Sequence, residues 1–128
     1  MITAREVFDA MRLTGGLDPD SLAEDVVVEE PFAPPGRPRR FEGKAAWLEF
    51  ATQQRANLPF TLDSQRITAL HETTDPEVLV VEYELTGTAL ATGRVSTAPF
   101  VGVLRVRDGL VIGWREYQDK AAIARALA

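Results

Sequence analysis

The sequence of 128 residues predicts one α+β domain, with helices packed on one face of a curved antiparallel sheet. Two observations support this fold class. The first half of the chain carries helical patterns and a proline-rich segment, whereas the second half is rich in Val, Leu, Thr and aromatic residues. Short turn sequences then divide the second half into four long segments. The length fits a single domain, 1–128.

The chain is expected to begin with a helix from about Ala4 to Leu13. Thr3 and Glu6 have the spacing of a capping box, in which each side chain satisfies a free backbone N–H of the other residue. The pair Gly15 and Gly16 is expected to end this helix.

The next segment is expected to form a short helix at Asp18–Glu24 and then a strand at Val26–Glu30. Prolines in residues 31–38 keep the following loop stiff and non-helical, since each proline fixes its own φ and keeps the residue before it extended. Apolar residues at helical spacing predict a second long helix from Lys44 to about Asn57, which Pro59 ends.

The second half is expected to form four antiparallel strands in meander order. These strands are Phe60–Glu72, Val78–Thr88, Arg94–Arg107 and Leu110–Asp119. The dipeptide Asp108-Gly109 is the strongest hairpin signal in the chain. Asp119 is placed to cap a last helix that continues through Leu127.

Strand alternation predicts which side chains enter the conical pocket that a sheet bent around helices would leave. On the last strand, one face is expected to carry Leu110, Ile112, Trp114, Glu116 and Gln118. On the preceding strand, an apolar face is expected to carry Ala98, Phe100, Gly102 and Leu104.

Glu30 and Glu116 are the candidate catalytic residues. Glu30 ends the first strand just before Pro31, and Glu116 shares a strand face with Trp114. Burial beside aromatic and aliphatic walls raises the pKa of a carboxyl group, which makes it a better proton acceptor or donor near neutral pH. Two such groups in one pocket repel each other and separate their pKa values, which gives one base and one acid.

A structural interpretation stays open at each of these positions. Glu30 could be a solvated strand end paired with one of three arginines, Arg37, Arg39 or Arg40, and Glu116 could face water or a dimer partner. His71 lies in a mixed segment where an exposed histidine is more common than a catalytic one.

Composition argues against several classes of protein. The net charge of −5 disfavours nonspecific binding to nucleic acid or to an anionic membrane surface. With no cysteine, a zinc site would have to be built from one histidine and carboxylates, so no metal is expected. No apolar run approaches the length that spans a bilayer, so the default expectation is a cytoplasmic protein.

The chain also resembles a known family. The strings "VVVEEPFAPPG", "RRFEGKAAWLEF", "VVEYELTGTALATGR" and "VLRVRDGLVIGWREYQD", in this order, resemble the SnoaL-like branch of the nuclear transport factor 2 (NTF2) and ketosteroid isomerase superfamily. The resemblance implies an NTF2-like cone, in which a curved sheet wraps around the N-terminal helices. It says little about the reaction, because this superfamily includes isomerases, polyketide cyclases, dehydratases, epoxide hydrolases and proteins without catalysis.

Particular residues carry this resemblance. "VEEP" is similar to the stretch that holds the base of ketosteroid isomerase, and it places Glu30 at that position. The two oxyanion donors of that enzyme fall on Phe8 and Gly102, so steroid isomerisation itself is not expected. The acid of SnoaL-type cyclases is matched by Glu116. An epoxide hydrolase trio would need Arg94 between Glu82 and Glu116.

The leading hypothesis is a homodimeric protein without a cofactor, whose apolar cavity binds a small hydrophobic or aromatic molecule. Its reaction would be proton transfer next to a carbonyl, with Glu30 as base and Glu116 as acid or second base. The expected walls are Phe8, Phe32, Trp47, Phe100, Gly102, Trp114 and Gln118. The alternatives are a ligand-binding or scaffold module without catalysis, and an epoxide hydrolase or dehydratase. An open cavity with a buried carboxylate would favour an enzyme.

Overall fold

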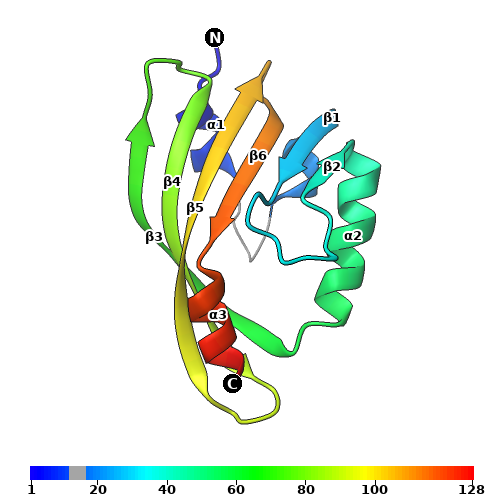
Figure 1. Ribbon diagram of the computed structural model, residues 1–128. Helices are drawn as coiled ribbons and strands as arrows, with labels where there is room; N and C mark the ends of the chain where they lie inside the picture. The colour runs from blue at the N-terminus through cyan, green and yellow to red at the C-terminus, as the bar shows by residue number, and fades with distance from the viewer. Residues whose placement is uncertain (12–16) are drawn as a thin grey trace.

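The computed structural model describes residues 1–11 and 17–128 of the chain (Figure 1). In these residues the helices are α1 (Ala4–Ala10), α2 (Lys44–Ala56) and α3 (Lys120–Leu127), with one 3₁₀ turn, η1 (Pro19–Ser21). The strands are β1 (Leu22–Glu29), β2 (Arg40–Glu42), β3 (Phe60–Glu72), β4 (Val78–Ala89), β5 (Val95–Arg107) and β6 (Leu110–Gln118). The predicted α+β class is confirmed.

The strands form one curved, open sheet in the order β2-β1-β6-β5-β4-β3. Figure 1 shows the helices at different parts of this sheet: α1 packs against β4 and β5, α2 lies beside β1 and β2, and α3 lies against β5 at the opposite end from α1. A sheet that curves around helices in this way encloses space on its concave side, which is the cone expected of an NTF2-like fold.

The predicted meander is confirmed, because β3, β4, β5 and β6 pair in sequence order and antiparallel. The turn between β5 and β6 has Asp108 at φ 52° and Gly109 at φ 80°, the two left-handed residues of a type I′ hairpin. The sheet also contains a parallel pair that was not predicted, since β1 joins the meander parallel to β6.

The first helix has the predicted start and an earlier end. The capping box of Thr3 and Glu6 is present, with both backbone N–H groups satisfied. The helix ends at Ala10 because Met11 has an extended backbone, so the prediction was wrong at Met11. The rest of the predicted end, at Leu13, Gly15 and Gly16, lies outside the described residues.

The prediction of a helix at Asp18–Glu24 is wrong, because only the 3₁₀ turn Pro19–Ser21 is helical there. The side chain of Asp18 accepts a hydrogen bond from the N–H of Asp20, which closes a tight local turn instead of an α-helix. The chain is already in β1 at Leu22, which is buried and pairs with Val111 of β6. Packing of this end against the sheet therefore outweighs its helical pattern.

Strand β2 was not predicted either. Its three residues pair antiparallel with Val27–Glu29 of β1, and the N–H of Glu30 continues the ladder by donating to the carbonyl of Arg39 at 2.9 Å. A strand of this length carries too little alternation to be recognised after a proline-rich loop. The pairing matters because it holds the chain in place where Glu30 begins to leave the sheet.

The face pattern predicted for the last strand is wrong at its beginning. Arg105 of β5 pairs with Gly113, but the next residue, Val106, pairs with Val111, so Ile112 is an extra residue in β6. This β-bulge reverses the alternation. Val111 is therefore fully buried while Leu110 is 41% exposed, and the predicted inward face holds only from Trp114 onward.

The core lies between the inner face of the sheet and the helices. Its largest fully buried side chains are Val26, Val28, Leu79, Val81, Leu104, Val106 and Val111. Trp47, Leu48 and Phe50 of α2 are only partly buried, although they pack against this core. Helix α2 is therefore not pressed onto the sheet along its whole inner side, and a cavity lies beneath it.

Candidate functional site

A cavity of about 940 Å³ lies between α2, the inner face of the sheet and α3. Its wall from the sheet and the β1 end includes Val28, Glu30, Gln65, Val81, Tyr83, Leu85, Phe100, Trp114, Glu116 and Gln118. Its wall from α2 includes Trp47, Leu48, Ala51, Thr52, Gln54 and Arg55, and α3 adds Ile123 and Leu127. Its volume lies in the range of sites that bind small molecules.

The structure brings six of the nine predicted site residues to this cavity. They are Glu30, Trp47, Phe100, Trp114, Glu116 and Gln118. They come from the end of β1 and from α2, β5 and β6, so segments distant in sequence meet around one cavity.

The other three predicted residues lie elsewhere. Phe8 packs in the core from α1, because α1 lies against β4 and β5. Phe32 is 52% exposed and makes an edge contact with Tyr117, with ring centroids 5.4 Å apart. Gly102 lies behind the indole of Trp114, where an added Cβ would be 2.0 Å from the ring. The ring of Trp114, not Gly102, is therefore the cavity wall.

Glu30 is the one buried charged side chain among the described residues, with 5% of its surface exposed. The guanidinium of Arg37 donates to Glu30 Oε2 at 3.3 Å and also lies 5.5 Å from the ring centroid of Phe50. Burial raises the pKa of the Glu30 carboxyl above its ordinary 4.5, the charge of Glu116 raises it further, and Arg37 opposes both. The raised pKa moves Glu30 towards the range where it can exchange protons near neutral pH.

Glu116 is half-buried and both of its oxygens accept hydrogen bonds. The hydroxyl of Tyr83 donates to Oε2 at 2.6 Å, and the side-chain amide of Gln118 donates to Oε1 at 3.0 Å. Burial and the neighbouring charge of Glu116 raise the pKa of Tyr83 strongly, so its hydroxyl keeps its proton. Tyr83 is therefore a permanent hydrogen-bond donor beside two carboxyl groups.

Three aromatic rings form one surface next to these polar groups. Tyr83 stacks on Phe100 with centroids 5.4 Å apart and an interplanar angle of 11°. Trp114 lies 6.3 Å from Tyr83 at an angle of 33°. A flat, apolar surface beside carboxyl groups suits a ligand that carries a planar or hydrocarbon body and a polar oxygen.

Tyr83 is the main functional candidate that the sequence reasoning missed. The alternation of Val81, Tyr83 and Leu85 on β4 contained the signal, because it places all three on one face. Tyr83 also pairs directly with Phe100, a residue already expected to line the pocket. The sequence places Arg37 in the proline-rich loop as one of three arginines that could pair with Glu30.

The structure distinguishes between the interpretations that the sequence leaves open at Glu30. Glu30 does pair with Arg37, as the structural alternative expected, but in a buried position and not at a solvated strand end. Arg40 pairs instead with Glu29 and Glu42. Of the three arginines considered as partners for Glu30, Arg37 is therefore the one that pairs with it.

The trio expected for an epoxide hydrolase is not assembled. Glu82 faces the outer side of the sheet, where it pairs with His71. Arg94 donates to the backbone carbonyl of Arg125 at the end of α3. Arg94, Glu82 and Glu116 therefore do not meet.

Within residues 1–11 and 17–128, no cluster of three or more His, Asp or Glu side chains could hold a metal ion. In the same ranges, no helix combines the length and the apolar character needed to cross a bilayer.

Comparison with known proteins gives the family. The model of the SnoaL-like domain matches residues 5–114, most of the chain. The chain belongs to the SnoaL-like family. An uncharacterized PhzA/B-like protein from Pseudomonas aeruginosa is 33% identical over 110 residues, which cover 84% of this chain and 74% of that protein.

Solved structures show the same fold. An NTF2-like protein from Burkholderia thailandensis has a TM-score of 0.75 and 16% identity, with 100% of this chain and 99% of that chain covered. A phenazine biosynthesis-related protein from Pseudomonas aeruginosa has a TM-score of 0.73 and 24% identity, with 97% and 84% covered. These similarities confirm the SnoaL-like, NTF2-like fold that the sequence resemblance implied.

Proposed function

We propose that this SnoaL-like protein binds a small, neutral, largely apolar carbonyl compound and moves a proton at the carbon next to the carbonyl, without a cofactor. The observation that carries this proposal is Glu30, a buried carboxyl group with a raised pKa on the wall of a cavity that also contains Glu116. Isomerisation, ring closure and dehydration all begin with such a proton transfer.

Glu30 is the proposed base. Its carboxylate takes a proton from the carbon beside the carbonyl, the electron pair of the broken C–H bond forms the enolate double bond, and the carbonyl oxygen takes the negative charge. Protonated Glu30 then returns the proton to carbon. Arg37 restrains the Glu30 side chain through its ion pair, which holds the carboxyl group at the cavity wall.

Tyr83 is the proposed donor to the substrate oxygen. Its hydroxyl keeps its proton and lies on the cavity wall, and Glu116 together with Gln118 fixes its direction. A substrate oxygen beside this hydroxyl can share the donor, which stabilises the negative charge that develops on an enolate. Tyr83 would thus supply what Phe8 and Gly102 cannot.

The same observations favour an enzyme over a scaffold. A scaffold would fill its cone with side chains, whereas this cone contains a cavity of about 940 Å³. Burying Glu30 costs free energy that a purely structural role would not require. A ligand-binding module without turnover remains the second candidate, because the same apolar walls would serve binding alone.

We also propose that the protein is a cytoplasmic homodimer whose outer sheet face forms the interface. Val101 and Val103 of β5 lie on this face, opposite to the inward Phe100 and Leu104, and are only half-buried. Sedimentation equilibrium should give twice the chain mass of 14.1 kDa. A mass equal to one chain would contradict the dimer and leave the cavity chemistry unaffected.

The proposed chemistry is tested by hydrogen exchange. Butyrophenone in D₂O should lose its α-hydrogen NMR signal faster with the wild-type protein than with buffer. Glu30→Gln should lower the exchange rate towards the buffer rate, while Glu82→Gln, a carboxylate on the outer face, should leave it unchanged. Equal rates for Glu30→Gln and the wild type would refute the role of Glu30.

A further inference from the structure

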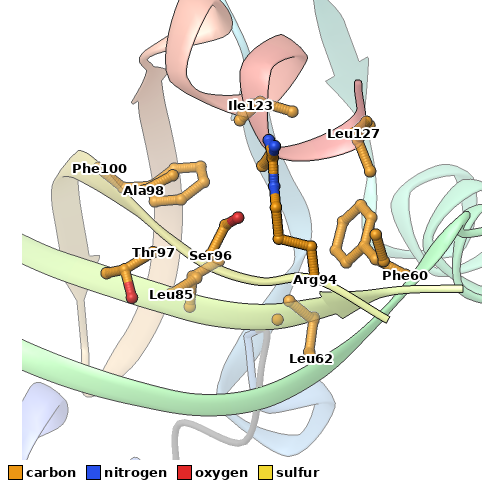
Figure 2. Close-up of a pocket in the computed structure, with 13 residues that line it drawn as sticks. Phe60, Leu62, Leu85, Arg94, Ser96, Thr97, Ala98, Phe100, Ile123 and Leu127 are labelled. Atoms are coloured by element: carbon orange, nitrogen blue, oxygen red, sulfur yellow. The ribbon is translucent and has the colours of Figure 1, made fainter. Parts of the chain in front are cut away.

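A second, smaller pocket of about 90 Å³ lies under α3 (Figure 2). Its walls come from the start of β3, from β4, from the start of β5 and from the inner side of α3. The lining residues are Phe60, Leu62, Leu85, Gly87, Ala89, Arg94, Ser96, Thr97, Ala98, Phe100, Ile123, Ala126 and Leu127.

The small pocket adjoins the large cavity. The two share six wall residues, which are Phe60, Leu62, Leu85, Phe100, Ile123 and Leu127. Neither Glu30 nor Glu116 lines the small pocket, so the carboxyl groups belong to the large cavity alone. A ligand held at the carboxyl groups could therefore extend an arm past Phe100 and under α3.

The walls of the small pocket are suited to hydrocarbon. Its polar wall residues are Arg94, Ser96 and Thr97. The hydroxyl of Thr97 is hydrogen-bonded to that of Thr86 at 2.8 Å. Figure 2 shows the side chain of Arg94 rising past the pocket towards α3, where its guanidinium donates to the carbonyl of Arg125. Mainly the aliphatic stem of Arg94 remains for the ligand.

We propose that this pocket is a subsite for a hydrocarbon arm, and that the ligand is a neutral ketone whose carbonyl lies at Glu30 and Tyr83. This inference rests on the proposed function. An anionic head group at this position is disfavoured because it would lie beside the carboxyl groups of Glu30 and Glu116, and because Arg37 is already paired with Glu30. An arm carrying charge or several hydroxyl groups would lose hydration under α3 without gaining matching partners.

The subsite also sets a limit on the arm. Leu62 and Leu127 form part of its wall and are each 37% exposed, so we take them as the rim of the proposed subsite. Each carbon that enters the pocket leaves water, which makes the binding free energy more favourable. Carbons beyond the rim stay in water and add nothing. Affinity should therefore rise with arm length and then level off.

A homologous series of alkyl phenyl ketones tests this proposal: acetophenone, butyrophenone, hexanophenone and octanophenone. Trp47 and Trp114 line the large cavity, so their fluorescence reports binding of each ketone to the full chain. In the wild type, the dissociation constant should fall about fourfold for each methylene that enters the subsite. It should stop falling once the arm reaches the rim.

Two variants block the subsite and leave the large cavity intact. Ala98 and Ala126 line only the small pocket, so Ala98→Leu and Ala126→Leu place extra carbon atoms where the arm would lie. Both variants should bind acetophenone like the wild type and lose the gain with longer ketones. Ala124→Leu is the matched control, because Ala124 is exposed on α3 and lines neither pocket.

The outcomes separate this inference from the proposed chemistry. Affinity that does not depend on arm length, a gain that persists in both blocked variants, or no binding by any ketone would each overturn the subsite. Length-dependent binding that is lost in both blocked variants would support it. If the subsite is supported while Glu30→Gln retains full exchange activity, only the proposed chemistry fails.

Discussion

The inner and outer faces of the sheet carry the same kinds of residue in different surroundings. On the outer face, Glu82 pairs with His71 and Glu84 pairs with Arg66, and the side chain of Glu82 is 45% exposed. On the inner side, Glu30 also pairs with a cation, Arg37, but its side chain is only 7% exposed and the charge of Glu116 acts on it.

The difference shows that an ion pair alone does not make a carboxylate a candidate base. Exposed pairs of this kind contribute little, because water already solvates both charges. Burial and the nearby charge of Glu116 are what raise the pKa of Glu30. Matched substitutions on the two faces can test this contrast, since each inner residue of interest has an outer counterpart.

The largest expected effect is at the carboxylates. Glu30→Gln removes the proposed base and should lower the rate of α-hydrogen exchange in butyrophenone by roughly 10²–10⁴-fold. Glu82→Gln should retain the wild-type rate, because its carboxylate lies on the outer face. NMR in D₂O measures both rates, and similar losses in the two variants would mean that the inner position is not special.

The next effect is at the two tyrosines. Tyr83→Phe removes the donor that points to Glu116, and should lower the exchange rate by about 10²-fold while the fold is retained. Tyr117 contacts Arg115 and Phe32 on the outer face, so Tyr117→Phe should have little effect on the rate. Unchanged exchange in Tyr83→Phe would remove Tyr83 from the proposed mechanism.

A third contrast concerns two glycines and stability. At Gly102 a Cβ would meet Trp114 at 2.0 Å, so Gly102→Ala should lower the unfolding free energy by about 1–3 kcal/mol or force the indole into the cavity. At Gly113 a Cβ would lie 3.5 Å from Arg105, which is an ordinary contact, so Gly113→Ala should cost less. Urea unfolding of both variants measures the difference, and an equal or larger cost at Gly113 would contradict the packing of Trp114 on Gly102.

The smallest effect is a pH dependence of stability. The pKa of Glu30 is higher in the folded protein than the ordinary 4.5, so the folded state binds its proton more strongly than the unfolded state. The contribution of Glu30 to stability is therefore complete below about pH 4.5 and is lost as the pH rises through the folded pKa.

This pH dependence is measured as a difference between variants. The unfolding free energy of the wild type should fall relative to that of Glu30→Gln as the pH rises through this window. Glu82→Gln should show the same fall as the wild type. A constant difference between the wild type and Glu30→Gln at every pH would argue against a raised pKa.

Much of the fold could be predicted because its signals are local. The capping box at Thr3, the Asp108-Gly109 hairpin and the Asp119 cap of α3 each depend on a few neighbouring residues, and all three are present. Strand β2 and the parallel partner of β6 depend on pairing between distant segments, which leaves no comparable trace in a single sequence.

The candidate site was likewise predictable only where its signals are local in the sequence. Glu30 and Glu116 could be chosen from a strand end and from alternation, and both line the cavity. The bulge at Ile112 could not be anticipated. Leu110, Val111 and Ile112 are all apolar, so the sequence does not show which of them face the core. Tyr83 was missed because its importance depends on contacts with Phe100 on β5 and with Glu116 on β6, which are distant in sequence.

The most direct test of the central claim is a ¹³C NMR titration of the Glu30 carboxyl carbon in the wild type and in Glu116→Gln. In the wild type the pKa of Glu30 should lie above 4.5, and removal of the Glu116 charge should lower it part of the way while burial keeps it raised. A Glu30 pKa at or below 4.5 in the wild type, or one unchanged in Glu116→Gln, would contradict a shared, buried pair of carboxyl groups.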